Sequence, residues 1–372
     1  MMNLTHSQCL ESAAKGNINI ILLHYNQTGR LNGRPRTSVS FLTILFILIS
    51  ILIIFENLMV LLALLRFLRL KRWVHCCLTN IAFSDLLAGI SYLLNICLSG
   101  PTTFRLTPQL WFLREGLLFT TLAASTFSLL ITAVERYSTM VISMAERQPA
   151  KLFRVQGLII LSWVLAAAVG SLPLLGWNCL CHIEDCSSLL PLYSRNYIVF
   201  SLGLLGITLL GIIGFYCTIY YFVCTSAKRV AATHQSRRAF HLLQTVLIIL
   251  GCFVLCWSPL FLFLLVDSAC TPPSCQSPLG LEWVLALAVL NSAFNPLIYS
   301  LRSSEVRKAI IALLCCACSW AGMQPPACCQ QVTEITSGSS NESSIKRRSS
   351  VRLSRNLSFR SPVTSVSSVP SQ

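Results

Sequence analysis

Seven long apolar stretches constrain the fold of this chain more than any other feature. The hydrocarbon core of a bilayer is about 30 Å thick, and a helix needs about 20 mostly apolar residues to cross it. Seven segments meet this length: Phe41–Leu65, Trp73–Leu98, Leu110–Ile131, Val155–Leu175, Tyr197–Val223, Leu242–Val266 and Leu281–Leu301. Because backbone polar groups find no partners in lipid, such segments have to be helical. We therefore predict an all-α membrane protein, with a seven-helix transmembrane bundle over residues 41–301.

The composition argues against an ordinary water-soluble domain. Hydrophobic residues make up 54% of the 372 residues and charged residues only 11%, whereas soluble domains carry about 25% charged residues. The formal net charge of +15 would by itself suggest a nucleic-acid partner. The Lys and Arg residues cluster in short segments between the apolar stretches, however, which is typical of membrane proteins. We therefore expect membrane lipid, and no nucleic acid, as a partner.

The charge of the connecting segments predicts the orientation in the membrane. One set is rich in cations: Arg66, Arg69, Lys71, Arg72, Arg147, Lys151, Arg154, Lys228, Arg229, Arg237 and Arg238. The opposite set is sparser, with Arg105, Arg114 and Arg195. Because cytoplasmic loops carry the excess of Lys and Arg, we expect a multi-pass protein of the cell membrane with its N-terminus outside and its C-terminus in the cytoplasm. Asn3 and Asn26, each in an Asn-X-Thr triplet, are then accessible glycosylation acceptors.

Residues 302–318 follow the last apolar stretch and differ from it in pattern. Glu305–Leu314 places its apolar residues on one face, which predicts a short amphipathic eighth helix on the inner membrane surface. Cys315, Cys316 and Cys318 come next and are candidates for palmitoylation; the alternative is that they are plain reduced cysteines. Residues 319–372 are polar and rich in Ser and Thr, so we expect a disordered cytoplasmic tail.

Ionisable and polar residues inside the predicted spans are candidates for a conformational switch, because they are costly in lipid. Asp85 lies in the middle of the second span, where it is expected to hold a cation such as sodium, or a water cluster. Its expected neighbours are Ser125, Asn291 and Asn295. Glu56, deep in the first span, has no role that the sequence explains.

The cytoplasmic end of the third span carries Glu135-Arg136-Tyr137. We expect Arg136 to pair with Glu135 in a closed state and, once freed, to turn toward a partner or toward Tyr216 and Tyr299. Prolines that remove backbone hydrogen bonds predict kinks in the sixth and seventh helices, at Pro259 and Pro296. Together these residues predict a two-state element.

In this order, on these spans, the motifs closely resemble the rhodopsin-like G-protein-coupled receptors. The runs that carry the resemblance are Asn80–Leu87 around Asp85, Glu135–Tyr137, Cys256–Pro259 and Asn295–Tyr299. The resemblance covers about Phe41 to Leu314. It implies a heterotrimeric G protein as partner, with Arg136 central to coupling, and arrestin and receptor kinases acting on the tail. No nucleophile–base pair or metal cluster converges, so we expect neither an enzyme nor a bound cofactor.

The outer end of the third span carries the adjacent charges Arg114 and Glu115. At about 1.5 Å per residue, Arg114 lies about 33 Å from Arg136, near the opposite membrane border. Neighbours on a helix point about 100° apart, so we expect the two charges to engage separate charges of one ligand. A guanidinium suits phosphate and a carboxylate suits an ammonium group. The plain alternative is an interface pair that extends to water.

The sequence departs from most rhodopsin-like receptors in two ways. The fifth span has no proline, and no cysteine lies between Cys97 and Cys179, so the usual disulfide to the third helix is impossible. Five runs resemble the sphingosine 1-phosphate receptors, which also lack that cysteine: His24–Arg30, Leu86–Gly89, Trp111–Gly116, Gly176–Cys179 and Leu190–Tyr193. That family closes its loops by internal disulfides, which implies the pairs Cys179–Cys186 and Cys270–Cys275 and leaves Cys181 unassigned.

Three further runs are similar to one subtype of this family in particular: Arg72–Val74, Ala123–Phe127 and Cys179–Cys181. Against this, Cys270 and Cys275 match the other subtypes better.

The resemblance also implies a role for individual residues of the outer site. Residues 1–40 would form an extracellular cap, in which Tyr25 and Arg30 join Arg114 in holding the ligand phosphate. Glu115 would take the ligand ammonium, helped by Asn95. The alkyl chain would lie among Phe119, Leu122, Trp257, Phe261, Leu264 and Leu285. These assignments predict a receptor for sphingosine 1-phosphate.

Two other functions remain as alternatives. Receptors for lysophosphatidic acid resemble the chain but carry glutamine where Glu115 stands, since their ligand has no amine, and a buried carboxylate without a cation is unfavourable. A lipid transporter or channel is a different class, but the sequence offers no inverted repeat or charged path through the bilayer. The G proteins implied by the resemblance are those of the inhibitory class, with the twelve/thirteen class second.

Overall fold

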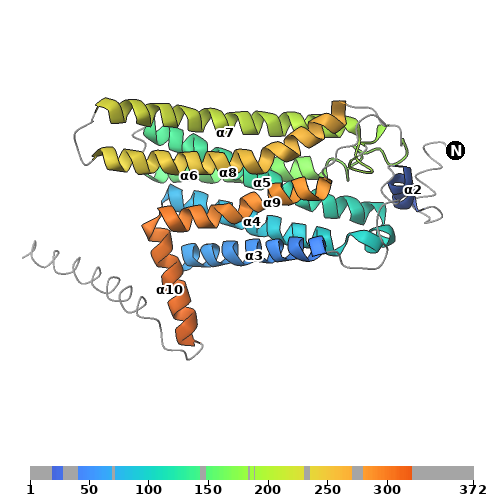
Figure 1. Cartoon of the computed structure of the whole chain (residues 1–372), viewed down its shortest axis with the longest axis horizontal. Helices are drawn as coiled ribbons and strands as arrows, with labels where there is room; N and C mark the ends of the chain where they lie inside the picture. Colours follow the sequence, from blue (N-terminus) through green and yellow to red (C-terminus); the bar gives the residue numbers. More distant parts are fainter. Residues whose placement is uncertain are drawn as a thin grey trace, which may run out of the picture. The chain divides into compact units, whose positions relative to one another are not determined.

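A computed structural model describes residues 19–27, 41–68, 72–142, 148–182, 185–187, 189–229, 235–269 and 280–320. Within these ranges, seven helices are long and apolar enough to cross a membrane. They are α3 (Phe41–Phe67), α4 (Trp73–Cys97), α5 (Pro108–Met140), α6 (Gln148–Ser171), α7 (Arg195–Arg229), α8 (Gln235–Ala269) and α9 (Leu281–Arg302), packed side by side (Figure 1). The seven-helix prediction is therefore confirmed.

Most helix ends extend beyond the apolar stretches that predicted them, but α4 ends one residue before the predicted Leu98 and α6 ends at Ser171, before the predicted Leu175. Helix α5 begins at Pro108, where the missing proline N–H costs nothing, and the Thr107 hydroxyl caps it by accepting a bond from the Leu110 amide (3.3 Å). Helix α7 runs through without a proline, whereas Pro259 lies inside α8 and Pro296 inside α9. Hydropathy indicates where lipid begins, but the backbone hydrogen bonds continue past that point, so six of these seven helices are longer than the predicted spans.

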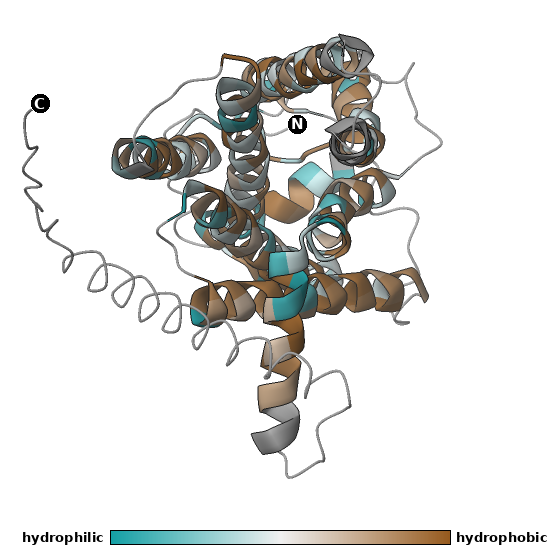
Figure 2. Cartoon of the chain, turned by 90° about the vertical axis from the view of Figure 1, so that its left-hand side faces the viewer, coloured by the Kyte–Doolittle hydropathy of each residue, from teal (hydrophilic) through white to brown (hydrophobic). Residues whose placement is uncertain are grey.

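The distribution of side chains is that of a lipid-embedded bundle. Ile207 and Leu210 of α7 are 73% and 71% exposed, whereas Asn57 and Asp85 are completely buried. Figure 2 views the end of the bundle opposite α2 and shows hydrophobic residues along the helices. Water would penalise such outward apolar faces, and a bilayer does not.

Helices α5 and α6 approach each other closely through two glycines. A Cβ built on Gly116 would meet the Gly170 carbonyl oxygen at 2.6 Å, and one on Gly170 would meet the Gly116 oxygen at 2.8 Å. Small residues allow membrane helices to pack backbone to backbone in this way. This contact lies next to Glu115, so it contributes to the position of the outer site.

One end of the bundle carries short elements that hydropathy does not predict. Helix α2 (Ile20–Gln27) lies at this end, as does the 3-10 turn η1 (Gly100–Arg105) between α4 and α5 (Figure 1). The connection from α6 to α7, here called the second loop (residues 172–194), crosses the same end and contains the disulfide Cys179–Cys186. The predicted N-terminal cap thus contains a helix.

Helix α10 (Ser304–Trp320) follows α9 after a break at Ser303, and it is longer than the predicted Glu305–Leu314. Its residues up to Arg307 belong to the compact unit of the bundle, and those from Lys308 belong to a second unit. Asn3, Arg30, the pair Cys270–Cys275 and the tail after residue 320 lie outside the described residues.

Candidate functional site

Arg114 and Glu115 form an ion pair at the α2 end of α5. The Arg114 Nε donates to Glu115 Oε1 at 2.9 Å, and Nη2 donates to the same oxygen at 2.5 Å. The expectation that adjacent residues point apart is therefore wrong. Cα–Cβ directions differ by about 100°, but the two long side chains bend toward each other because both are largely buried, with 4% and 13% of the side chain exposed. A buried charge needs a partner.

The Arg114 guanidinium is also held by neighbouring elements. Its Nη1 donates to the Leu98 carbonyl (2.7 Å) at the end of α4 and to the Thr103 hydroxyl (3.1 Å) of η1. It also lies over the ring of Trp111, 5.7 Å from the centroid. The guanidinium therefore links α5 to α4 and η1.

Asn95 and Tyr25, two other predicted head-group residues, have different surroundings in the structure. The side-chain amide nitrogen of Asn95 on α4 is buried with no hydrogen-bond partner among the described residues. Tyr25 of α2 packs edge-on against Phe104 of η1, with the ring centroids 5.4 Å apart. An orphaned buried amide costs free energy in the folded state, so Asn95 is a candidate to bind a polar ligand group.

The predicted alkyl-channel residues come together in one hydrophobic cluster. Leu122, Trp257 and Leu264 are buried in it, and Phe119, Phe261 and Leu285 pack against it. The ring of Tyr193, from the second loop, lies 5.5 Å from that of Phe119. Burial raises the pKa of Tyr193 well above its usual value, so its hydroxyl stays neutral. The interior below the charge pair is therefore apolar.

A separate crevice of about 290 Å³ runs between α4 and α5, beside Arg114. Its lining residues are almost all leucines: Leu94, Leu98, Leu106, Leu110, Leu113 and Leu117, with Ser91 and Arg114. Four of these leucines are exposed on the outer surface of the bundle. The crevice therefore opens on the lateral surface of the bundle, between α4 and α5.

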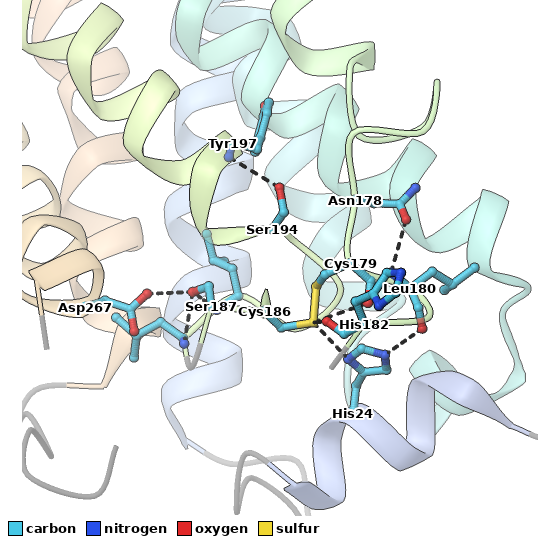
Figure 3. Close-up of a disulfide and its surroundings, with 12 residues drawn as sticks. His24, Asn178, Cys179, Leu180, His182, Cys186, Ser187, Ser194, Tyr197 and Asp267 are labelled. Atoms are coloured by element: carbon cyan, nitrogen blue, oxygen red, sulfur yellow. Dashed lines mark hydrogen bonds between the residues drawn. A yellow bond between two sulfur atoms is a disulfide. The ribbon is translucent and has the colours of Figure 1, made fainter. Parts of the chain in front are cut away.

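The second loop is closed by Cys179–Cys186, with the Cα atoms 5.5 Å apart, as predicted. His24 of α2 lies against this disulfide (Figure 3). Ligand atoms of His24, Cys179 and Cys186 lie within 4.8 Å of one another, but a disulfide leaves no thiolate for a metal. Cys181 is also disulfide-bonded.

Asp85 lies in the middle of the bundle and accepts three hydrogen bonds. Its carboxylate accepts from Ser125 (2.6 Å) and Asn295 (2.7 Å), as expected. The third donor is the Ser292 hydroxyl (2.8 Å), in place of the predicted Asn291, whose amide nitrogen is buried without a partner among the described residues. Ser292 and Asn295, three residues apart, share a face of α9. Asn57 donates to the Ser292 carbonyl (3.0 Å) and extends the network to α3.

The pair of Glu135 with Arg136 that is predicted for a closed state is not formed in this structure. Glu135 is buried and accepts two 3.0 Å bonds from Arg154 of α6, with the Lys151 Nζ 3.6 Å away. Arg136 instead lies over the Trp73 ring, 5.6 Å from its centroid, and Lys151 lies over the same ring at 4.1 Å. Two cations from a neighbouring helix have better access to the Glu135 carboxylate than the adjacent residue has.

Arg136 also interacts electrostatically with Tyr216 and Tyr299, the two tyrosines proposed from the sequence. Tyr137 packs against Phe215, with the ring centroids 5.3 Å apart. The described coupling residues therefore gather at the end of the bundle opposite α2.

Glu305, at the start of α10, belongs to this same end. It accepts bonds from Arg72 (3.1 Å) and lies 3.2 Å from the His75 ring nitrogen. These contacts, His75 first, lower the pKa of Glu305 below its usual value. The carboxylate thus ties the bundle to the start of α10.

The structure also describes several other residues that the sequence singled out. Asn26 is exposed on α2. Cys315 is disulfide-bonded, which leaves Cys316, an exposed free thiol, as the acylation candidate whose side chain the structure describes. Glu56 has a buried Oε2 with no hydrogen-bond partner among the described residues, and the structure gives it no role.

The sequence reasoning missed His24, Ser292, Trp73, Lys151 and Arg154 as site residues. Lys151 and Arg154 lie in a segment that hydropathy assigns to a loop, but they stand three residues apart at the start of a helix and therefore share one face. That spacing was the available signal for the Glu135 partner. His24 and Ser292 carry no comparable pattern.

Comparison with known proteins gives a consistent result. Residues 56–299 match the family "7 transmembrane receptor (rhodopsin family)". The chain is 51% identical to sphingosine 1-phosphate receptor 4 of Homo sapiens, over 98% of this chain and 97% of the relative. It is 48% identical to the Mus musculus receptor 4 (99% and 97%), and 44% identical to receptor 3 of Takifugu rubripes (80% and 79%). The subtype suggested by Arg72–Val74 and the two companion runs was subtype 4, and these identities bear it out. The chain therefore belongs to the rhodopsin-like seven-transmembrane receptors and, within them, to the sphingosine 1-phosphate receptor family.

Proposed function

We propose that this chain is a cell-surface receptor that binds sphingosine 1-phosphate at the α2 end of the bundle and activates heterotrimeric G proteins at the opposite end. The buried Arg114–Glu115 pair above an apolar cluster carries the proposal. A zwitterionic head group presents a phosphate and an ammonium, and it can satisfy both members of a buried ion pair that it opens. An uncharged lipid head that separated Arg114 from Glu115 would leave both charges without partners.

In this proposal each charge has its own role. Arg114, with Tyr25 and Arg30 from the cap, holds the phosphate. Glu115 takes the ammonium, helped by the Asn95 amide, which has no protein partner among the described residues. The alkyl chain lies among the six cluster residues named above, Phe119 to Leu285.

Positive charge supports the proposed orientation. The end opposite α2 carries Arg66, Arg72, Lys151, Arg154 and Arg302, whereas Arg105 and Arg195 are the described cations of the α2 end outside the ion pair. The positive-inside rule then puts α2 and the second loop outside the cell and the C-terminal tail in the cytoplasm. Asn3 and Asn26 would be the glycosylation sites, and Cys316 and Cys318 the acylation sites.

As the family resemblance implies, the proposed G-protein partners are those of the inhibitory class, with the twelve/thirteen class second. Arg136 would make the central contact, with Tyr216 and Tyr299 as its alternative neighbours. Arrestin and receptor kinases would act on the tail. Asp85, Ser125 and Ser292 present oxygen atoms suited to a hard cation such as sodium, which would stabilise the closed state at mid-bundle.

The proposal is tested by G-protein activation in cells that express wild type, Arg114→Ala or Glu115→Gln. We expect Arg114→Ala to abolish the response to sphingosine 1-phosphate, and Glu115→Gln to weaken it and to favour lysophosphatidic acid, which has a phosphate but no amine. An unchanged response to both lipids in Glu115→Gln would contradict the assignment. A full response of Arg114→Ala would refute the head-group site.

A further inference from the structure

His24 occupies the contact between the N-terminal helix and the rest of the extracellular end. On α2, Ile20, Ile21 and His24 are buried, whereas Leu22 and Leu23 are exposed. The buried residues have helical spacing, so they lie on one face of α2, and this face packs against the end of the bundle. His24 is the polar member of that face and is only 1% exposed.

The His24 ring makes two contacts with the second loop (Figure 3). Its Nε2 lies 3.1 Å from the Leu180 carbonyl, and its Nδ1 lies 3.6 Å from the Cys186 sulfur. Because a carbonyl oxygen only accepts, Nε2 must carry the hydrogen. The Cys186 sulfur carries no hydrogen, so its contact with Nδ1 does not fix the protonation of that nitrogen. The burial of the ring favours the neutral form, because burial disfavours a charged group.

The surface that His24 contacts is rigid. The Cys179–Cys186 disulfide closes the loop, and the Cys179 amide donates to the Leu192 carbonyl at 3.1 Å. The Asn178 side chain accepts from the Leu180 amide (3.1 Å) and so fixes the segment that carries the accepting carbonyl. A hydrogen bond to such a fixed acceptor constrains α2 itself.

A second chain of contacts leads from α2 to the ion pair. Tyr25, the next residue, packs edge-on against Phe104 of η1, and Asn19 donates to the Phe104 carbonyl at 2.7 Å. The neighbouring Thr103 hydroxyl accepts from Arg114. A displacement of α2 therefore reaches Arg114 through η1.

We propose that His24 is the positioning residue that holds α2 closed over the Arg114–Glu115 site, and that it does so as a neutral imidazole. His24 touches the second loop and acts on the site through α2 and η1. This inference rests on the proposed function where it concerns ligand affinity, whereas the closure of α2 is measurable without a ligand.

The electrostatics of the contact support a dependence on pH. Burial lowers the pKa of His24 below its usual value of 6.5, and the bond to the Leu180 carbonyl opposes that change. The titratable residues described on the two elements that pack against α2 are Arg105 of η1, and His182, Asp185 and Tyr193 of the second loop. The docked form thus binds a proton less readily than the free form. We therefore expect docking to be most stable above pH 6.5 and to weaken as the pH falls through the lowered pKa of docked His24.

Two substitutions separate the hydrogen bond from the titration. His24→Phe keeps a ring but removes the donor, and we expect it to accelerate dissociation of labelled sphingosine 1-phosphate by about tenfold at pH 7.4. Maximal G-protein activation should stay at the wild-type value. His24→Gln places an amide donor near the position of Nε2, so it should restore slow dissociation and remove the pH dependence. Leu23→Ala, on the exposed face of α2, is the matched control and should behave as wild type.

Hydrogen exchange of the α2 amides in purified receptor without ligand is the independent measurement. We expect faster exchange of Ile20–Gln27 in His24→Phe, and in wild type below about pH 6. Equal exchange and equal dissociation in His24→Phe and wild type would overturn the proposal, as would an unchanged pH profile in His24→Gln. If the exchange changes as expected but wild type binds no sphingosine 1-phosphate, the proposed ligand is wrong and the role of His24 in closure stands.

Discussion

The Glu135 carboxylate of α5 is bound by Arg154 of α6, with both carboxylate oxygens 3.0 Å from the same Nη2, and its chain neighbour Arg136 is left over the ring of Trp73. In the sequence, Glu135 and Arg136 are the obvious pair. In the structure, Lys151 and Arg154 supply the positive charge that the buried carboxylate needs. This arrangement releases Arg136 for other contacts at the coupling end.

Neutralising Lys151 and Arg154 of α6 should allow the Glu135 carboxylate to form an ion pair with Arg136. We expect Lys151→Gln combined with Arg154→Gln to lower maximal agonist-driven G-protein activation about fivefold or more, with ligand affinity unchanged, because Arg136 becomes engaged. The same pair of substitutions should have little effect in a Glu135→Gln background. Arg66→Gln, an exposed cation at the end of α3, serves as the control. Wild-type or raised activation at equal surface expression would show that the two cations do not set the partner of Glu135.

The Asp85 network predicts opposite outcomes for two neighbouring residues. Ser292→Ala removes a donor to Asp85, so it should destabilise the receptor by about 1–3 kcal/mol and lower its Tm in detergent. Asn291→Ala removes an amide nitrogen that has no partner among the described residues, so it should leave the Tm unchanged or raise it. The ranking is contradicted if Asn291→Ala is the more damaging substitution.

The α5–α6 contact predicts a second matched pair. Gly170→Ala would press a Cβ against the Gly116 oxygen and the Thr120 side chain, so the helices must separate. We expect a destabilisation of about 1–3 kcal/mol and weaker ligand binding, because Gly116 adjoins Glu115. Gly157→Ala, in the same α6 with open space around it, should be neutral or slightly stabilising. Thermal unfolding and a binding isotherm for each variant check this, and equal Tm values would exclude the close contact.

Substitutions of Asn95 and Asn80, both on α4, should distinguish an effect on ligand binding from an effect on stability. Asn80 donates to Ser128 (2.7 Å) and accepts from Trp163 (2.9 Å), so Asn80→Ala should lower the Tm. Asn95→Ala removes an amide without a protein partner among the described residues and should not lower the Tm, but we expect it to weaken sphingosine 1-phosphate binding by about tenfold. Binding as tight as that of wild type would remove Asn95 from the head-group site.

The sequence alone predicted the seven helices, because hydropathy is a feature that is local along the chain, and the resemblance to the receptor family implied the disulfide Cys179–Cys186. Hydropathy averages over about 20 residues, so an error of a residue or two does not alter a span. The family motifs similarly identified Asp85, Ser125 and Asn295 as members of one network. The short helix α2 escaped prediction as a helix because its stability comes from packing on η1 and the second loop.

The partners of individual side chains were decided only by the tertiary structure. One residue along a helix is a rotation of about 100°, so the tilt and rotation that packing gives each helix determine which polar group meets which. That is why Ser292 rather than Asn291 reaches Asp85, and why Arg154 rather than Arg136 binds Glu135. It is also why Arg114 and Glu115, expected to diverge, bind each other where burial leaves them no water. The sequence determines that the chain spans a bilayer seven times and which charged residues lie within the spans. The packing of the helices determines which of those charges are paired.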